Sequence, residues 1–347
     1  MYKLRGNHLV KTTPRIVNLM ALVFFVQIMF LFGCFSALAA EKPITLRLSN
    51  GLALGTYQNT VLIPDFINEI KDKTNGGVVI ENYPASSLFG HIATADALHR
   101  GAVEMGFNSL NHFVGYSPVM AFNDYAFLVP DIESWKKNYD ATFEITSQIL
   151  NKIGVKLLSF VPYSSTAIIS SKPINVPSDC KGLRIRGISD PFFDCIKSWG
   201  GVPAAMNPAE AYDAMAKGSL DGIMSGWDSV KSRKYYEIAG YVTGPTAAPI
   251  WGYMMNLNTW NKLPEDIQKI VQEAADNSSR KGMEGQDKYD EETITFLREK
   301  NMQIKVLTPE EVVVWKKATL PAYDVYLKRC SEKNAEDVAK RLLEIYQ

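Results

Sequence analysis

The segment PEDIQKIVQEAADNSSRKGMEGQDKYDEETITFLREK, residues 264–300, decides the fold because it has no proline after its first residue and repeats apolar residues at helical spacing. The apolar positions follow the i, i+3, i+4, i+7 spacing of one helix face, at Ile267, Ile270, Val271 and Ala274. A continuous helix of this length spans about 55 Å. Because that exceeds one small lobe, we expect a helix that braces two lobes, unless Gly282 and Gly285 interrupt it.

Upstream of this segment, strand-like and helix-like patterns alternate along the chain. The first group comprises predicted strands at 44–49, 78–83 and 103–107 and predicted helices at 61–75 and 91–100. The pattern restarts near residue 155, with predicted strands at 155–160, 167–170 and 183–188 and predicted helices at 207–217 and 228–238. This alternation predicts two α/β lobes with a largely parallel sheet.

The composition is that of an ordinary globular protein. Of 347 residues, 46% are hydrophobic, and 16 Phe, 16 Tyr and 6 Trp can form substantial cores, which argues against disorder. Lys and Arg number 37, as do Asp and Glu. Because there is no basic excess, the composition gives no support to nucleic-acid binding.

The first 40 residues differ from the rest. They contain four basic residues and no acidic one, then an apolar run at 16–35 and the small residues Ser36-Ala37-Leu38-Ala39-Ala40. This order is typical of a secretory signal peptide, so we expect export and cleavage after Ala39 or Ala40. An uncleaved anchor and a lipoprotein site at Leu31-Phe32-Gly33-Cys34 remain alternatives. Cleavage leaves 33 basic against 37 acidic residues, a formal charge of −4, so an anionic ligand needs a local cation.

The inventory of catalytic side chains is thin. The sequence has no Walker loop, no Gly-x-Ser-x-Gly elbow and no His-Glu-x-x-His pair. His91 and His99 stand eight residues apart on one predicted helix, and we expect them to be surface or capping residues. We therefore expect no enzyme, no cofactor and no metal site.

Three cysteines follow the predicted signal peptide, namely Cys180, Cys195 and Cys330. An odd number of thiols cannot all pair. A disulfide between Cys180 and Cys195 and a set of small, partly buried thiols are both open interpretations.

The segment KGLRIR at 181–186 carries the clearest binding chemistry. Arg184 and Arg186 share one side of a predicted strand, while Leu183 and Ile185 take the other. A guanidinium can hold a carboxylate through two parallel hydrogen bonds. Taken alone, however, such arginines are more often solvated surface residues.

A set of segments in fixed order and spacing extends this observation over nearly all of the chain after the signal peptide. The segments are YPASSLFG at 83–90, RGAVEM at 100–105, KGLRIR at 181–186, WGGVP at 199–203, NPAEAY at 207–212, KGSLDG at 217–222 and LPEDIQ at 263–268. In this order they resemble the solute-binding subunit of tripartite ATP-independent periplasmic (TRAP) transporters, of the DctP type.

The resemblance implies an α/β, two-lobed fold like that of type II periplasmic binding proteins, with a hinge and a long helix that spans both lobes. We expect lobe I at 41–163 plus 252–291 and lobe II at 164–251 plus 292–347. Such a receptor closes on an organic acid in the periplasm and delivers it to a membrane permease that an ion gradient drives. The expected ligand is a C4-dicarboxylate or a bulkier monocarboxylate.

The resemblance also assigns positions in the site. In the family, the last arginine of the KGLRIR-like segment pairs with the ligand carboxylate, which here is Arg186, while Arg184 stays a solvated or structural neighbour. A second family arginine is replaced by Thr166, so a second ionic clamp is in doubt. After Asp221-Gly222, Ser225 and Trp227 stand in a less polar segment than sugar-acid receptors show. The remaining expected ligand contacts are Asn108, Ser109, Trp251, Tyr163, Phe192 and Tyr57.

Two other classes of protein compete with this interpretation. The binding protein of an ATP-driven importer or a sensory ligand-binding protein would have a similar lobe architecture. An exported α/β hydrolase would need a nucleophile beside a base, and the few histidines have no evident partner.

Overall fold

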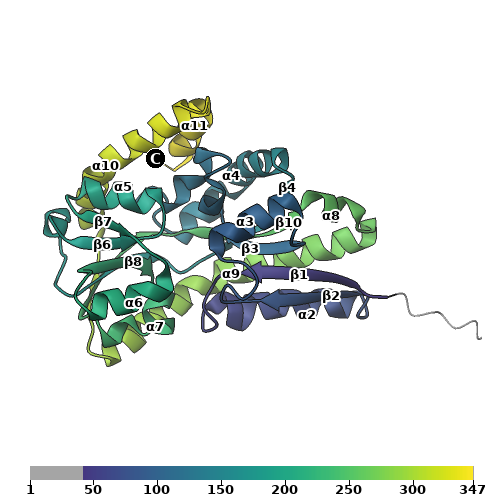
Figure 1. The fold of residues 1–347 in the computed structure, drawn as a ribbon, viewed down its shortest axis with the longest axis horizontal. Helices are drawn as coiled ribbons and strands as arrows, with labels where there is room; N and C mark the ends of the chain where they lie inside the picture. The colour runs from purple at the N-terminus through teal and green to yellow at the C-terminus, as the bar shows by residue number, and fades with distance from the viewer. Residues whose placement is uncertain (1–41, 347) are drawn as a thin grey trace, which may run out of the picture. The chain divides into compact units, whose positions relative to one another are not determined.

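Two β-sheets, covered by helices, make up the part of the chain that the computed structural model describes, residues 42–346 (Figure 1). The predicted signal peptide at 1–40 lies outside these residues. Within residues 42–346, the structure contains no helix with the length and apolar character needed to cross a membrane.

The first sheet has the strand order β2-β1-β3-β10-β4. Its strands are β1 (Ile44–Asn50), β2 (Val78–Tyr83), β3 (Met105–Ser109), β4 (Val155–Pro162) and β10 (Ile250–Asn256). In β1, Leu46 and Leu48 are buried whereas Thr45 is exposed, as the alternating pattern predicts. β1 is parallel to β2 and β3, but β10 is antiparallel to both of its neighbours.

The second sheet has the strand order β11-β9-β5-β8-β6-β7. Its strands are β5 (Thr166–Ser170), β6 (Arg184–Gly187), β7 (Val202–Ala205), β8 (Gly222–Gly226), β9 (Tyr241–Ala247) and β11 (Gln303–Val306). β5 is antiparallel to β8 and β9, whereas β6 is parallel to β7 and β8. The expectation of a largely parallel sheet is therefore confirmed for both sheets. β10 in the first sheet and β5 in the second are the strands that run against the others, and each follows a point where the chain changes sheet.

The chain passes between the sheets in short connections. β4 ends at Pro162 in the first sheet and β5 begins at Thr166 in the second; β9 and β10 are joined by two residues in the return direction. Gly226, at the end of β8, packs directly on the first connection. A Cβ atom there would lie 2.9 Å from the Tyr163 ring and 3.0 Å from the Ser164 carbonyl oxygen, so this close approach requires glycine.

The long helix predicted from residues 264–300 is α9 (Glu265–Glu299), and it is continuous. It contacts β4 and α2 (Ile63–Lys73) beside the first sheet and α7 (Trp227–Ser232) and β11 beside the second (Figure 1). Gly282 does not interrupt the helix. It lets α9 pack closely on β4, because a Cβ atom there would lie 3.0 Å from Pro162 Cδ.

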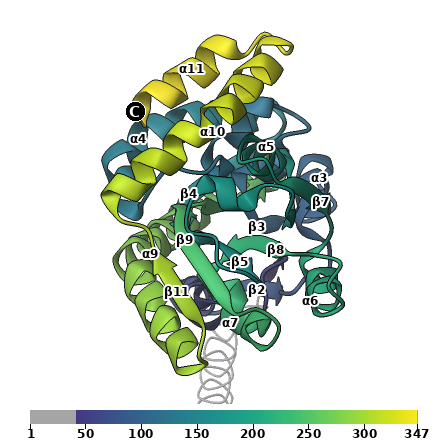
Figure 2. The same ribbon diagram turned by 90° about the vertical axis from the view of Figure 1, so that its left-hand side faces the viewer.

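The other helices cover the sheets and carry the loops of the cleft. They are α3 (His91–Arg100), α4 (Ile132–Lys152), α5 (Asp190–Ser198), α6 (Pro208–Ala216), α8 (Leu257–Lys262), α10 (Pro309–Ser331) and α11 (Glu336–Ile345). Helix α10, the last but one in the chain, packs on α5 and α11 (Figure 2). The predicted helix at 228–238 is instead α7 followed by a 3₁₀ turn, η5 (Tyr235–Glu237), because Lys234 adopts a left-handed conformation with φ 57°.

Short helical turns complete the described elements. They are the π-helical turn η1 (Gln58–Leu62) and the 3₁₀ turns η2 (Leu110–Phe113), η3 (Pro118–Asp124) and η4 (Pro177–Cys180). All residues of η2 are buried, and η3 is buried from Val119 to Asp124. The two turns between β3 and α4 are thus interior segments, joined by a short stretch in which Gly115 and Tyr116 are exposed.

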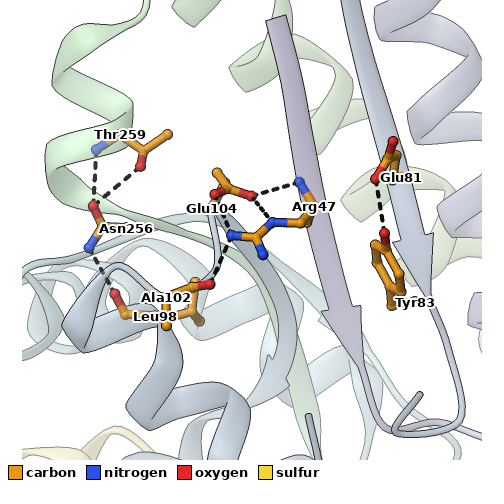
Figure 3. A network of polar contacts seen from close by, with 8 residues as sticks. All are labelled: Arg47, Glu81, Tyr83, Leu98, Ala102, Glu104, Asn256 and Thr259. Carbon is orange, nitrogen blue, oxygen red and sulfur yellow. Dashed lines mark hydrogen bonds and ion pairs between the residues drawn. The ribbon is translucent and has the colours of Figure 1, made fainter. Parts of the chain in front are cut away.

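A polar network holds the end of β3 that lies away from the cleft (Figure 3). Arg47 on β1 donates from Nε and Nη2 to the two carboxylate oxygens of Glu104, each over 2.8 Å. The side-chain nitrogen of Asn256 donates to the carbonyl oxygen of Leu98 over 2.8 Å. These bonds fix β1, α3 and β10 around the start of β3, whose other end reaches the site described next.

Candidate functional site

A cavity of about 80 Å³ lies between the two sheets, at the connection from β4 to β5. Since one water needs about 10–15 Å³ of such space, this volume suits a small organic molecule. Side chains of both sheets line it: Leu52, Ala53, His91, Ser109, Asn111, His112, Asp124, Tyr163, Thr166, Arg186, Ile188, Phe192, Pro208, Met224, Ser225, Gly226, Ser229, Arg233, Pro249 and Trp251.

Arg186 on β6 brings a buried positive charge to this cavity. Its side chain is 2% exposed. Nε donates to the carbonyl oxygen of Met206 over 3.0 Å and Nη1 to that of Met224 over 3.4 Å, while Nη2 has no hydrogen-bond partner in the protein. Burial, and to a lesser degree the charge of Arg233, lowers the pKa of Arg186 to about 10, so the guanidinium is still charged at neutral pH.

Polar atoms without partners concentrate in the cavity. Of thirteen such buried side-chain atoms in the described part of the chain, five belong to lining residues: Arg186 Nη2, Asp124 Oδ1, Ser109 Oγ, Asn111 Oδ1 and His91 Nδ1. Buried polar groups in folded proteins nearly always have a hydrogen-bond partner. This clustering therefore indicates a site whose partner is a bound polar molecule.

The wall formed by the first sheet carries two neutral histidines. Burial lowers the pKa of His91 to about 4 and that of His112 well below its usual range. In the amide orientation that pairs both of its atoms, Asn108 donates to His112 Nδ1 over 2.5 Å and accepts from the Ala95 amide over 3.2 Å. Because Nδ1 accepts, the single proton of neutral His112 lies on Nε2, and Asn108 positions this ring.

An aromatic cluster forms the apolar part of the site around Trp251. The centroid of its ring lies 5.5 Å from that of His91, 5.3 Å from that of His112 and 5.5 Å from that of Tyr163. The Tyr163 hydroxyl is 3.1 Å from Ser229 Oγ on α7. Tyr163 thus joins the wall of the first sheet to an element of the second.

The structure brings together six of the nine side chains that the sequence predicts for the site. These six line the cavity: Arg186, Ser225, Ser109, Trp251, Tyr163 and Phe192. Thr166, at the position of the missing second arginine, also lines it. Its hydroxyl is 2.8 Å from that of Thr246, so the position carries a neutral hydrogen-bonding group.

The other three predicted residues do not line the cavity. Trp227 begins α7 but is 1% exposed and packs in the core of the second sheet with Ile169 and Val230. Asn108 lies behind His112, as described above. Tyr57 stacks on Tyr289 of α9, with ring centroids 5.1 Å apart. In these three cases the local sequence favours a side chain near the cleft, but packing directs the side chain away from the cavity and into the protein interior.

Six polar lining residues were not predicted from the sequence, namely His91, Asn111, His112, Asp124, Ser229 and Arg233. The expectation that His91 is a surface or capping residue is wrong, because its ring turns into the cavity at the start of α3. His112 and Asp124 belong to the interior turns η2 and η3, which have no motif. Arg233 follows α7 and also lines the larger outer cleft.

The described residues contain no cluster of three or more His, Cys, Asp or Glu side chains that could hold a metal ion. Cys180, Cys195 and Cys330 are buried free thiols, so the open alternative of a disulfide between Cys180 and Cys195 is not realised. The cavity is lined by hydrogen-bonding groups, aromatic rings, the carboxyl group of Asp124 and two arginines.

The sequence model of the bacterial extracellular solute-binding proteins of family 7, DctP, matches residues 52–329. The chain belongs to this family. A curated relative, the C4-dicarboxylate-binding periplasmic protein DctP of Vibrio cholerae, is 26% identical over 267 residues, which cover 75% of this chain and 79% of the relative. The resemblance drawn from the ordered segments is thus confirmed.

Solved structures of TRAP receptors share the two-lobed fold. A TRAP periplasmic solute binding protein of Shewanella oneidensis with bound succinate matches with a TM-score of 0.79 and 21% identity, covering 88% of this chain and all of that one. DctP7 of Bordetella pertussis, a receptor binding pyroglutamic acid, matches with a TM-score of 0.79 and 19% identity, covering 87% and 99%. The predicted two-lobed α/β fold is therefore confirmed.

Proposed function

We propose that this DctP-family protein captures an organic acid between its two lobes in the periplasm and delivers it to the membrane subunits of a TRAP transporter. The observation that carries the proposal is Arg186, a buried guanidinium with an unpartnered Nη2 atom in a cavity between the sheets. A buried charge without a counter-charge is costly. A ligand carboxylate supplies the missing acceptor and the missing charge.

Capture needs the two walls to move apart and to close again. The expected boundary at residue 251 would cut β10, which begins at Ile250 and pairs with β3 and β4 of the first sheet. We therefore propose lobes at 44–163 plus 250–291 and at 164–249 plus 292–347, which turn about the connections next to Tyr163 and Ala248. Closure brings the Arg186 wall against the Trp251 wall and removes water from the ion pair, which strengthens it. Nothing in this cycle makes or breaks a covalent bond, so we propose a receptor and not an enzyme.

Export and partner follow from the same proposal. The segment at 1–40 acts as the signal peptide, and the closed receptor presents its ligand to a permease that an ion gradient drives. Uptake of labelled acid into proteoliposomes that contain the TRAP permease, with and without a sodium gradient, tests the partner. Uptake that needs ATP instead would support the importer alternative.

The Arg186→Gln variant tests the ligand-binding part. Truncating one partner of a buried charge pair costs about 2–5 kcal/mol, which corresponds to roughly 30- to several-thousand-fold in affinity. We expect this loss in calorimetric titrations with an acid found by a thermal-shift screen, together with an unchanged fold.

Arg184→Gln is the matched control, because Arg184 lies on the same strand but is half-exposed and donates to Asp221 and to the Gly218 carbonyl oxygen. It should keep the affinity within about threefold. An Arg186→Gln variant that binds as well as this control would remove Arg186 from the site.

A further inference from the structure

The cavity is lined by an acidic side chain, Asp124, that has no role in the capture of a simple carboxylate. Asp124, the last residue of η3, is 5% exposed and lines the cavity. Its Oδ1 atom has no hydrogen-bond partner in the protein. Among the described residues that line the cavity, Asp124 is the one carboxyl group. A buried carboxyl group that faces a binding cavity needs a donor, and the protein does not supply one for this oxygen.

Asp124 and Arg186 face the same cavity without forming an ion pair. The ion pairs within 4.0 Å that join described residues elsewhere in the chain include neither of these side chains. An acid and a base that share a small low-dielectric space attract each other strongly. Since the fold keeps them on separate walls, a molecule placed between them can satisfy both at once.

We propose that the ligand is a small zwitterionic amino acid whose carboxylate binds Arg186 and whose protonated amine binds Asp124. This inference rests on the proposed function of the Arg186 site and names the class of acid that the site selects. The ammonium group supplies the donor that Asp124 Oδ1 lacks, and the carboxylate supplies the acceptor that Arg186 Nη2 lacks.

The charges of the walls favour an amine over a second carboxylate. His91 and His112 are neutral at physiological pH, because burial lowers the pKa of each. The wall from the first sheet and its turns therefore offers no positive charge, and it carries Asp124. A second carboxylate would have to lie against this acid, whereas an ammonium group finds a carboxylate and the aromatic rings of Trp251 and Phe192 nearby.

Titration of Asp124 gives the proposal a directional test. The pKa of Asp124 is raised to about 7, and burial is the cause of this shift. The titratable and charged groups on the elements packed against η3 and around the cavity are His112 on η2, Asp194 and Cys195 on α5, Tyr323, Tyr326 and Arg329 on α10, Tyr346 after α11, and Arg186, Arg233, His91 and Tyr163 in the lining. If the amine binds the ionised carboxylate, affinity falls as Asp124 becomes protonated. If a second carboxylate binds the neutral acid, affinity rises instead.

The first experiment compares amino acids with analogues that lack the amine. A thermal-shift screen of the exported protein covers the common amino acids, their 2-hydroxy analogues, 4-aminobutyrate, butyrate and the C3–C6 dicarboxylates. Each hit is then titrated by calorimetry beside its partners of equal chain length. We expect the amine member of a set to bind at least about 30-fold more tightly than the others, as for loss of one partner of a buried charge pair.

The outcomes separate this inference from the proposed function. Hits confined to dicarboxylates, hydroxy acids or simple carboxylates, or equal affinity with and without the amine, would overturn the zwitterion proposal and leave acid capture intact. Absence of any hit across the panel would contradict both.

The Asp124→Asn variant and a pH series give the second experiment. Wild-type affinity for the amino acid should weaken about tenfold per pH unit below pH 7, whereas Asp124→Asn should bind at least about 30-fold more weakly at pH 8 and show a flat profile. Asp190→Asn removes the same charge from the start of α5, where Asp190 is half-exposed and outside this cavity. This control should stay within about threefold of wild type. A wild-type affinity that rises on acidification, or an Asp124→Asn variant equal to the control, would overturn the proposal.

Discussion

The pair Arg329–Asp194 and the pair Arg186–Asp124 consist of the same two side-chain types, but the fold treats them differently. Arg329 on α10 forms a forked ion pair with Asp194 on α5, with Nη2 donating to Oδ1 over 3.0 Å and Nη1 to Oδ2. Tyr125 donates to the same carboxylate over 2.8 Å. In the cavity, Arg186 donates to two backbone carbonyls instead, and Asp124 keeps an unpartnered oxygen.

The difference separates an ion pair that serves folding from two unpaired charged side chains that, in our proposal, serve binding. Asp194 satisfies Arg329 within the protein, and the hydrogen bond raises the pKa of Arg329. The pair thereby ties α10 to α5 at low cost. Arg186 and Asp124 each keep a buried polar atom without a hydrogen-bond partner, which lowers the stability of the ligand-free protein. A ligand that supplies these partners removes the cost, and the gain adds to its binding free energy.

The largest effect that this comparison predicts is a loss of stability without a loss of binding. Asp194→Ala leaves the Arg329 guanidinium and the Tyr125 hydroxyl without their acceptor. Removal of one partner from a buried pair costs about 3–5 kcal/mol, and because Arg329 is 33% exposed, water offsets part of this. We expect a decrease of about 2–4 kcal/mol in the free energy of unfolding, measured in urea.

Ligand affinity of the folded Asp194→Ala protein should stay within about threefold of wild type, because Asp194 does not line the cavity. Tyr125→Phe, which removes one hydroxyl and keeps the ion pair, is the milder control and should cost about 1 kcal/mol. A large loss of affinity in the folded Asp194→Ala protein would show that the two pairs are coupled.

Removing the charge of the cavity carboxylate Asp124 should have the opposite effect and raise the free energy of unfolding. The pKa of Asp124 is raised from 3.8 to about 7 in the folded state, so folding favours its protonated form. Burial of the Asp124 carboxyl group therefore costs no stability below about pH 4, where the group is protonated in both states. As pH rises from there through 7 the folded protein loses stability, because the group ionises readily in the unfolded chain but not when it is buried. Asp124→Asn should therefore match wild type near pH 4 and exceed it at pH 8 by about 1–2 kcal/mol, well below the upper bound of about 4 kcal/mol that the full shift implies.

Urea unfolding of both proteins without ligand, at pH 4.5 and pH 8, measures this difference. The change between the two pH values isolates Asp124, because both proteins carry the same other acids, including Asp290, whose pKa burial also raises to about 7. A variant that is less stable than wild type at pH 8 would mean that the Asp124 carboxylate is stabilised by the protein and is not held for a ligand.

The sequence predicted what depends on local periodicity. α9 could be predicted because apolar spacing and the absence of proline extend over its whole length. β1 follows from the alternation of apolar and polar residues at 44–49, and β2 from the short apolar run after Gly76-Gly77. The pattern of KGLRIR by itself predicts a strand, whereas the role of Arg186 came from the resemblance of the ordered segments to the DctP family. These features are set by short stretches of chain.

Asp124, His112 and Arg233 could not be predicted, because their role depends on packing between distant segments. Asp124 and His112 both lie in buried 3₁₀ turns. Asp124 is in η3, which packs against α5, α10 and α11, and His112 is in η2, which packs against α3, β3 and β10. Trp227 shows the converse error. Its position after β8 placed it near the cleft, but the turn into α7 directs the ring into the core of the second sheet.

The smallest expected effect concerns Arg233, the second cation near the Arg186–Asp124 pair. It lines both the cavity and the outer cleft, so its field reaches an acid that is entering the site. A charge at a rim acts mainly on the association rate and its salt dependence. Arg233→Gln should therefore slow association about two- to fivefold at low salt, with little change in dissociation.

Stopped-flow fluorescence can measure both rate constants of Arg233→Gln, because Trp251 lies in the cavity. Lys234→Gln, at an exposed neighbour that pairs with Glu237, is the matched control. A large increase in the dissociation rate of Arg233→Gln would instead place Arg233 on the bound ligand, and the site would then resemble a receptor for two carboxylates rather than for a zwitterion.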